Sequence, residues 1–161
     1  MVENAIREVT GSISGSLTLG ASTTIAEYML PSLLGDFNQK NPDVLLRLRV
    51  SNTEGIVSMV ENNVIDLGVV EGPVTNKNLL VEVCRQDDLV VVVPPDHDLV
   101  GQKSVSVEQM LEYPFICREE GSGTREVINE HLKEQGVSKH ALKASLELGS
   151  PEAIKGAIQA G

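Results

Sequence analysis

The sequence contains few aromatic residues and no tryptophan. Aromatic side chains make up 2% of its 161 residues, whereas hydrophobic residues as a whole make up 41%. Val, Leu and Ile must therefore fill the interior, which suits the buried strands of a parallel sheet. A chain of this length can form one large domain or two small ones, with a substantial core.

Basic residues and long apolar runs are also scarce. Lys and Arg number 13 against 23 Asp and Glu, and the formal net charge is -10. Non-specific nucleic-acid binding needs clustered positive charge, so this sequence is not expected to hold DNA by itself. No apolar run approaches the roughly 20 residues of a membrane span. The first residues lack the basic-then-apolar order of a signal peptide, and we expect a cytoplasmic protein.

Cysteine and histidine are too sparse to predict a metal centre or a redox pair. Cys84 and Cys117 do not form a Cys-x-x-Cys pair, and we expect both to be buried thiols. The histidines, His97, His131 and His140, are far apart, and their spacing matches no recognisable zinc or iron motif. No metal and no cofactor is therefore expected.

Alternating strand and helix patterns predict an α/β fold. The first half has strand-like runs at 16–21, 43–50 and 65–72, separated by helical patterns at 25–42 and 54–63. Leucines and arginines alternate in the second of these strands, which favours an edge position. The second half is predicted to contain a helix at 106–112, a strand at 114–117, a helix at 124–134, a strand at 142–148 and a helix at 151–160.

A domain crossing is predicted near two further strand-like runs, at 79–84 and 88–93, the second of which stops at Pro94. We therefore expect a linker remnant at 1–14, one subdomain at 15–93 and another at 94–161. The last predicted helix has no strand after it, so the second subdomain is expected to be incomplete at its C-terminal end.

Hydroxyl-bearing residues stand at four places where a predicted strand ends and a helix begins. A helix N-terminus favours an anion, and in parallel α/β folds ligands settle beyond the carboxyl ends of the strands. For each residue alone N-capping is the favoured explanation, but four matching positions favour a small polar ligand with negative charge. The residues are Ser22, Thr23 and Thr24; Ser51 and Thr53; Ser122 and Thr124, flanked by Gly121 and Gly123; and Ser150.

Arg125 lies in the first turn of a predicted helix, where a cation opposes the helix dipole. Either it binds an anion in bidentate fashion, or it pairs with Glu119, Glu120 or Glu126. The sequence favours neither interpretation.

Glu71 follows an apolar strand and is expected at the same edge of the sheet as the hydroxyl groups. It either orients Arg118 or Arg125, or meets an amino group or a proton of the ligand. A structural hydrogen bond to the backbone of the hinge is the third interpretation.

Taken in order, these motifs resemble the effector-binding domain of LysR-type transcriptional regulators, from about Gly15 to the end. Three segments are most similar to the CysL-like branch, which regulates sulfite reductase and related sulfur genes: "ASTTIAEYMLP", "LGVVEGPV" and "REEGSGTR". The elements that carry the resemblance are "GSLTLGASTTIAEYMLPSLLGDFNQKNPDV", "GIVSMVENNVIDLGVVEG", "DDLVVVVPPDHDL", "YPFICREEGSGTREV" and "LELGSPEAIKGAIQAG".

The resemblance implies two Rossmann-like subdomains joined by a two-strand hinge, as in type II periplasmic binding proteins, with the effector between them. It also implies a homodimer, a tetramer in the full-length protein, and DNA contact only through a helix-turn-helix domain that this sequence lacks. The implied ligand-binding residues are Ser22, Thr23, Thr53, Glu71, Gly72, Gly121, Ser122, Gly123, Thr124, Arg125 and Ser150.

We therefore expect an effector-sensing domain that binds a small anionic metabolite of sulfur metabolism, such as sulfite or sulfate. Binding would control DNA binding and transcription by the separate domain. Two alternatives stay open: a solute-binding protein for transport of a small anion, and a LysR-type regulator that senses a carbon or phosphate metabolite. An enzyme is not expected, because no predicted loop offers a histidine base to a Ser or Thr nucleophile.

Overall fold

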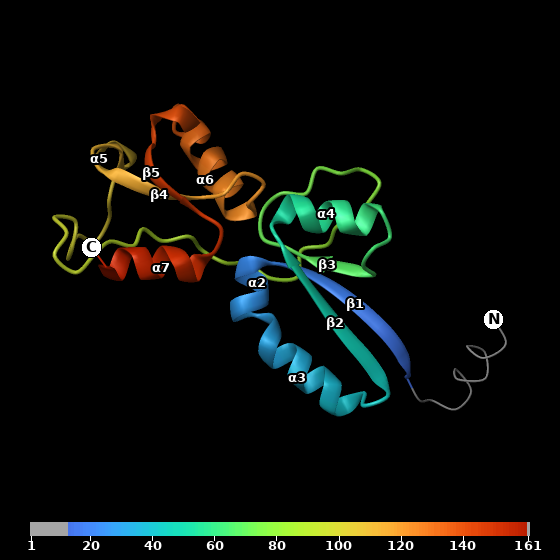
Figure 1. Cartoon of the computed structure of the whole chain (residues 1–161). Helices are drawn as coiled ribbons and strands as arrows, with labels where there is room; N and C mark the ends of the chain where they lie inside the picture. Colours follow the sequence, from blue (N-terminus) through green and yellow to red (C-terminus); the bar gives the residue numbers. More distant parts are fainter. Residues whose placement is uncertain (1–12, 161) are drawn as a thin grey trace. The chain divides into compact units, whose positions relative to one another are not determined.

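Parallel strands organise the first of the two units into which the chain divides, residues 1–71 and 72–161. The computed structural model describes residues 13–160. Most of the predicted linker remnant therefore lies outside the described residues. The assignment of two effector-binding subdomains, 15–93 and 94–161, stays a prediction. Figure 1 shows the strands and helices of each unit.

Three strands form the sheet of the first unit: β1 (Gly15–Ser22), β2 (Val44–Ser51) and β3 (Leu67–Val69). Their order is β2-β1-β3, and both pairs are parallel. The predicted edge position of β2 is confirmed. β3 is shorter than the strand expected at 65–72.

Three helices connect these strands: α2 (Thr23–Tyr28), α3 (Leu30–Lys40) and α4 (Thr53–Glu61). The sequence predicted a helical pattern at 25–42, with Pro31 either tolerated or kinking its first turns, where α2 and α3 stand. The break falls at Met29, because Pro31 cannot donate a hydrogen bond to the preceding turn and is accommodated only at the start of a new helix. In Figure 1, α3 and α4 flank the strands.

The core of the first unit brings α4 close to β1. Ile56 of α4 is 1% exposed, and Ile65 is also buried. A Cβ atom added at Gly20 of β1 would lie 2.3 Å from Ile65 Cδ1 and 3.0 Å from Ile56 Cδ1. The glycine therefore permits the close approach that sets the start of α4 beside the carboxyl ends of the strands.

The second unit contains a parallel pair of strands, β4 and β5, with helices between and after them. The five elements predicted at 106–160 are confirmed, each within one residue at either end. Leu132 of α6 is fully buried. The elements are α5 (Val107–Leu111), β4 (Pro114–Arg118), α6 (Gly123–Glu134), the 3₁₀ turn Lys139–Ala141, β5 (Lys143–Leu148) and α7 (Pro151–Ala160).

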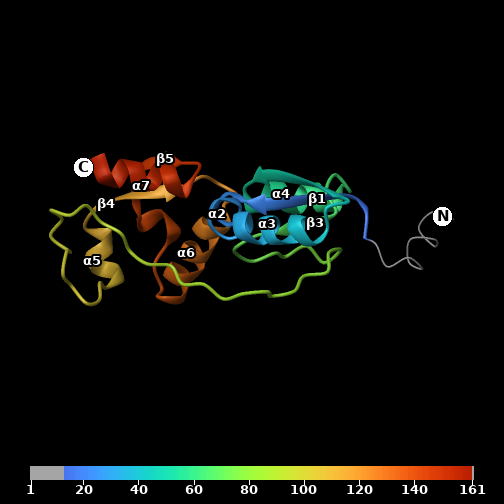
Figure 2. The same cartoon turned by 90° about the horizontal axis from the view of Figure 1, so that it is seen from below.

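Residues 70–106 contain neither helix nor strand, and Figure 2 shows this yellow-green segment as an irregular chain. The prediction of strands at 79–84 and 88–93 is wrong for the described residues. A strand needs a hydrogen-bonded neighbour, and no described segment supplies one. Cys84 is consequently exposed, and the prediction that it is buried is also wrong.

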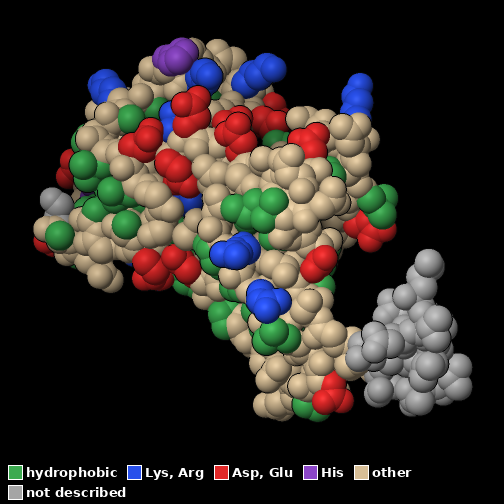
Figure 3. Space-filling view, turned by 45° about the vertical axis from the view of Figure 1, so that its right-hand side comes forward, with side chains coloured by type: hydrophobic (Ala, Val, Ile, Leu, Met, Phe, Trp, Pro, Cys, Tyr) green, Lys and Arg blue, Asp and Glu red, His purple; other side chains and the backbone are tan. Residues whose placement is uncertain are grey.

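The surface in Figure 3 carries acidic side chains across the upper part of the face shown, with fewer basic side chains among them. This distribution agrees with the formal net charge of -10. None of the described helices is long and apolar enough to cross a bilayer.

Candidate functional site

The carboxyl ends of the first unit's strands bring three predicted site residues together. The strand register places Ser22 opposite Ser51 and Ala21 opposite Val69. Thr53 begins α4 directly after β2, and Glu71 comes just after β3. Parallel strands end at the same edge, so the register explains the cluster.

The Glu71 carboxylate accepts hydrogen bonds from two hydroxyl groups of its own unit. Ser22 Oγ donates to Glu71 Oε2, and Thr24 Oγ1 donates to Glu71 Oε1 at 3.0 Å. Thr53 Oγ1 donates to the Glu71 carbonyl oxygen, also at 3.0 Å. Ser22 and Thr53 are buried, while Glu71 and Thr24 are half-buried. We call Ser22, Thr24 and Glu71 the hydroxyl–carboxylate cluster.

None of the three interpretations of Glu71 anticipated these partners. The sequence reasoning also left Thr24 out of the ligand-binding set, although it belongs to the same "STT" motif. Thr23 begins α2, and Gly72 follows Glu71 in the chain; both are half-buried.

Asn52 caps α4, since its Oδ1 accepts a hydrogen bond from Gly55 N at 2.9 Å. Ser22 occupies the N-cap position of α2, but its side chain makes no capping bond. The N-capping interpretation is therefore wrong for Ser22 and Thr53. It is confirmed for Ser150, whose Oγ accepts from Ala153 N at 3.2 Å.

In the second unit, two loops emerge at the same edge of the sheet because Arg118 of β4 pairs with Leu148 of β5. The first loop leads through Gly121, whose φ is +81°, into Ser122 at the N-cap of α6. The second carries Ser150. The predicted residues Gly121 and Ser122 thus lie on a loop next to the one that carries Ser150, and Gly123, Thr124 and Arg125 form the start of α6.

Ser122 is the most unusual residue of these loops. It is 1% exposed, its side chain does not cap α6, and its Oγ has no hydrogen-bond partner within residues 13–160. A buried polar group without a partner costs about 1–3 kcal/mol, so such a group calls for an explanation. A bound ligand that accepts its proton supplies one. Gly123 and Thr124 follow in the first turn of α6, whose N-terminus favours negative charge.

The two arginines near these loops are held by protein groups. Arg125 Nη1 donates to Glu147 Oε2 at 2.8 Å and to the Arg118 carbonyl oxygen at 3.0 Å. The prediction that Arg125 forms an ion pair with a glutamate is therefore confirmed. The partner, Glu147, is not one of the three glutamates that the sequence offered. Glu147 was missed because it lies on β5, and only the strand register brings it beside Arg125.

Arg118 is 3% exposed and connects the two loops. Its Nε and Nη2 atoms donate to Glu119 Oε2 and Oε1 at 2.8 and 2.9 Å, and Nη2 reaches the Gly149 carbonyl oxygen at 3.4 Å. Arg118 thus ties the start of one loop to the start of the other.

Cys117 precedes this arginine on β4 and is a free thiol of intermediate exposure. Burial raises the pKa of the Cys117 thiol, whereas the charge of Arg125 opposes the rise and that of Glu147 adds to it. The thiol is consequently a poor nucleophile at neutral pH.

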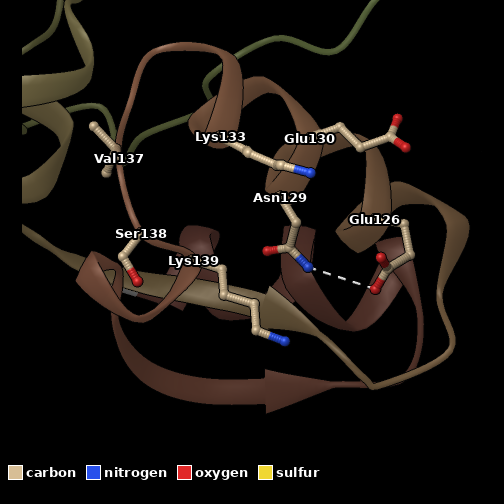
Figure 4. Close-up of a pocket in the computed structure, with 7 residues that line it drawn as sticks. All are labelled: Glu126, Asn129, Glu130, Lys133, Val137, Ser138 and Lys139. Atoms are coloured by element: carbon tan, nitrogen blue, oxygen red, sulfur yellow. Dashed lines mark hydrogen bonds between the residues drawn. The ribbon is translucent and has the colours of Figure 1, made fainter.

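A surface pocket of about 360 Å³ lies on α6 and the turn after it, and contains none of the predicted site residues. Figure 4 shows its mixed polar lining, with a hydrogen bond of 3.5 Å between Asn129 Nδ2 and Glu126 Oε1. Within the described part of the chain, no three His, Cys, Asp or Glu residues are placed to hold a metal ion.

Comparison with known proteins identifies the class to which this fold and these loops belong. The model of the LysR substrate binding domain matches residues 10–161. The chain belongs to this family, and its fold is the α/β effector-binding fold, similar to that of periplasmic binding proteins. It is a domain of transcriptional regulators and not an enzyme.

Individual relatives come from several regulatory systems. The RuBisCO operon transcriptional regulator of Allochromatium vinosum is 32% identical over 160 residues, which are 99% of this chain and 52% of the relative. The regulator CysL of Bacillus subtilis is 31% identical over 146 residues, 91% of this chain and 48% of the relative. The chain therefore spans about half the length of these regulators.

A solved structure is also similar to this chain. The regulatory domain of Synechocystis PCC6803 CcmR, in complex with 2-PG, matches with a TM-score of 0.73 and 36% identity. The match covers 90% of this chain and 68% of that domain.

Proposed function

We propose that this chain senses a small anionic metabolite of carbon metabolism and belongs to a regulator whose separate DNA-binding domain responds to it. The observation that carries the proposal is the 36% identity to the CcmR regulatory domain, which was solved with 2-PG. The 32% identity to a RuBisCO operon regulator supports the same metabolic area.

The expectation of a sulfur oxyanion has weaker support. CysL is one relative among regulators of carbon fixation, and its identity of 31% is no higher than theirs. The similarity to the CysL-like branch therefore does not select sulfite or sulfate. Membership of a regulator family also leaves the transport alternative without support.

The loop before α6 is the proposed binding place for the anionic end of the metabolite. Ser122 offers a buried hydroxyl group that has no hydrogen-bond partner among residues 13–160, and the twelve-residue helix α6 begins immediately after it. A hydroxyl donor and a helix N-terminus together favour a phosphate or carboxylate group. The complete proposed set is Ser22, Thr23, Thr53, Glu71 and Gly72 from the first unit, and Gly121, Ser122, Gly123, Thr124, Arg125 and Ser150 from the second.

Regulation then follows from differential affinity. An effector changes the DNA-binding domains only if it binds one conformational or oligomeric state of the regulator more tightly than another. We propose a cytoplasmic homodimer, tetrameric in the full-length regulator, as the form that switches.

Isothermal titration calorimetry of the chain tests the proposal with 2-phosphoglycolate, 3-phosphoglycerate, phosphate, sulfate, sulfite and O-acetylserine. At least one phosphorylated organic acid is expected to bind more tightly than sulfate and sulfite. Ser122→Ala should weaken its binding by about tenfold through loss of a charge-assisted hydrogen bond.

Ser32→Ala provides the matched control, because Ser32 is exposed on α3. It should leave the affinity unchanged. Absence of heat with every compound would contradict the proposal, and tighter binding of sulfite or sulfate would restore the sulfur alternative.

A further inference from the structure

The hydroxyl–carboxylate cluster constrains which end of a ligand the first unit accepts. A serine or threonine hydroxyl has a single proton to donate, and a carboxylate only accepts. Ser22 and Thr24 both donate that proton to Glu71. While these bonds are in place, neither hydroxyl can donate to an anionic ligand oxygen.

Thr53 is engaged in the same way, because its hydroxyl donates to the Glu71 carbonyl oxygen at 3.0 Å. The hydroxyl groups of Ser22, Thr24 and Thr53 therefore all donate to Glu71. What the cluster adds to the site is a negative charge and oxygen acceptors. A phosphate, sulfate or carboxylate oxygen placed against it meets like charge and receives no proton from Ser22 or Thr24.

We infer that Glu71 is a specificity-determining residue: it binds a hydroxyl or ammonium group of the effector and disfavours anions that lack such a donor. The inference rests on the proposed function and deepens it.

Burial strengthens the discrimination between ligands that carry a hydrogen-bond donor and ligands that lack one. Ser22 is 1% exposed and Glu71 is half-buried, so water competes for these groups less than it does at an open surface. In such surroundings the carboxylate repels an anionic group and attracts a hydrogen-bond donor more strongly than it would in open water.

Three probes with one carbon skeleton isolate this effect. 3-Phosphoglycerate carries a hydroxyl group at C2, O-phosphoserine carries an ammonium group there, and 3-phosphooxypropanoate carries neither. Calorimetric titration of the whole chain should give dissociation constants about tenfold or more lower for at least one of the first two than for the third.

Glu71→Gln removes the charge and keeps the shape of the side chain. It should reduce the preference for the donor-bearing probes to about twofold or less and tighten the binding of 3-phosphooxypropanoate. Glu61→Gln, an identical charge change at an exposed position of α4, should leave the preference unchanged.

Ser22→Ala is the second variant, for use if Glu71→Gln does not fold. It removes one of the donors that satisfy Glu71 and should therefore increase the preference for donor-bearing probes. Equal affinity of the wild-type chain for all three probes overturns the role of Glu71 but leaves the proposed function standing. No binding of any probe, of 2-phosphoglycolate or of phosphate overturns both.

Discussion

The guanidinium group of Arg118 is buried and folds back onto the carboxylate of its neighbour Glu119, with N–O distances of 2.8 and 2.9 Å. The same group reaches the Gly149 carbonyl oxygen on the neighbouring loop. The pair therefore anchors the loop that leads to Ser122 and α6.

Arg118→Ala should lower the free energy of unfolding by about 3 kcal/mol, because it leaves a half-buried carboxylate without its charged partner. Urea denaturation followed by circular dichroism measures the change. Lys155→Ala, which breaks the exposed pair between Lys155 and Glu152, should cost less than about 0.5 kcal/mol. Equal losses of unfolding free energy for the two variants would show that the burial of Arg118 adds nothing to the stability that its ion pair provides.

Gly121 has a φ of +81°, in the left-handed region that residues with a Cβ adopt at a cost. Gly121→Ala should therefore destabilise the chain by about 1–2 kcal/mol and weaken effector binding by moving Ser122. Thermal unfolding and calorimetry measure the two effects. Gly156→Ala in α7 is the control: open space surrounds that position, and alanine should stabilise the helix by up to about 1 kcal/mol.

Cys84 and Cys117 should differ in their rates of alkylation. A raised pKa means a smaller thiolate fraction at a given pH, and the Cys117 rate should keep increasing with pH beyond the range of an ordinary thiol. Iodoacetamide labelling at about pH 8, followed by mass spectrometry, should modify the exposed Cys84 first. Arg125→Gln removes the positive charge that lowers the pKa of Cys117, and it should therefore slow the alkylation of Cys117 further. Faster labelling of Cys117 than of Cys84 would contradict this assignment.

Thr53→Val replaces the buried hydroxyl group with a methyl group of the same shape. The Glu71 carbonyl oxygen loses the hydrogen bond from Thr53, and the chain should lose about 1–2 kcal/mol of stability. Chemical denaturation tests this value against Thr75→Val, an exposed position in the irregular segment where no effect is expected. A null result at both positions would mean that the Thr53 bond adds nothing to stability.

Local sequence patterns predicted most elements of the fold. The alternation of leucine and arginine identified β2 as an edge strand, and apolar periodicity located α6 and α7 to within one residue. Patterns of this kind depend on neighbours a few residues away, which the sequence displays directly. The family resemblance rested on the same local motifs, and the match to residues 10–161 confirmed it.

The irregular segment 70–106 shows the limit of prediction from local sequence patterns. Leu80 and Val83 belong to runs with high strand propensity, yet they are 90% and 85% exposed. Strand propensity describes how well a residue fits a sheet, and it cannot supply the neighbouring strand. A strand prediction for 79–93 therefore needed a pairing partner that no local pattern reveals.

The sequence by itself determined that parallel strands end in hydroxyl-bearing loops, since both the strands and the loops follow from residues close together in the chain. Only the tertiary structure decided what each hydroxyl does. Ser22 reaches Glu71 across 49 positions and Ser150 caps its own helix, while Ser122 has no hydrogen-bond partner in the part of the chain that the structure describes. These differences arise because a hydrogen bond is lost when the donor–acceptor distance grows by a few tenths of an ångström. Strand register and helix packing set that distance.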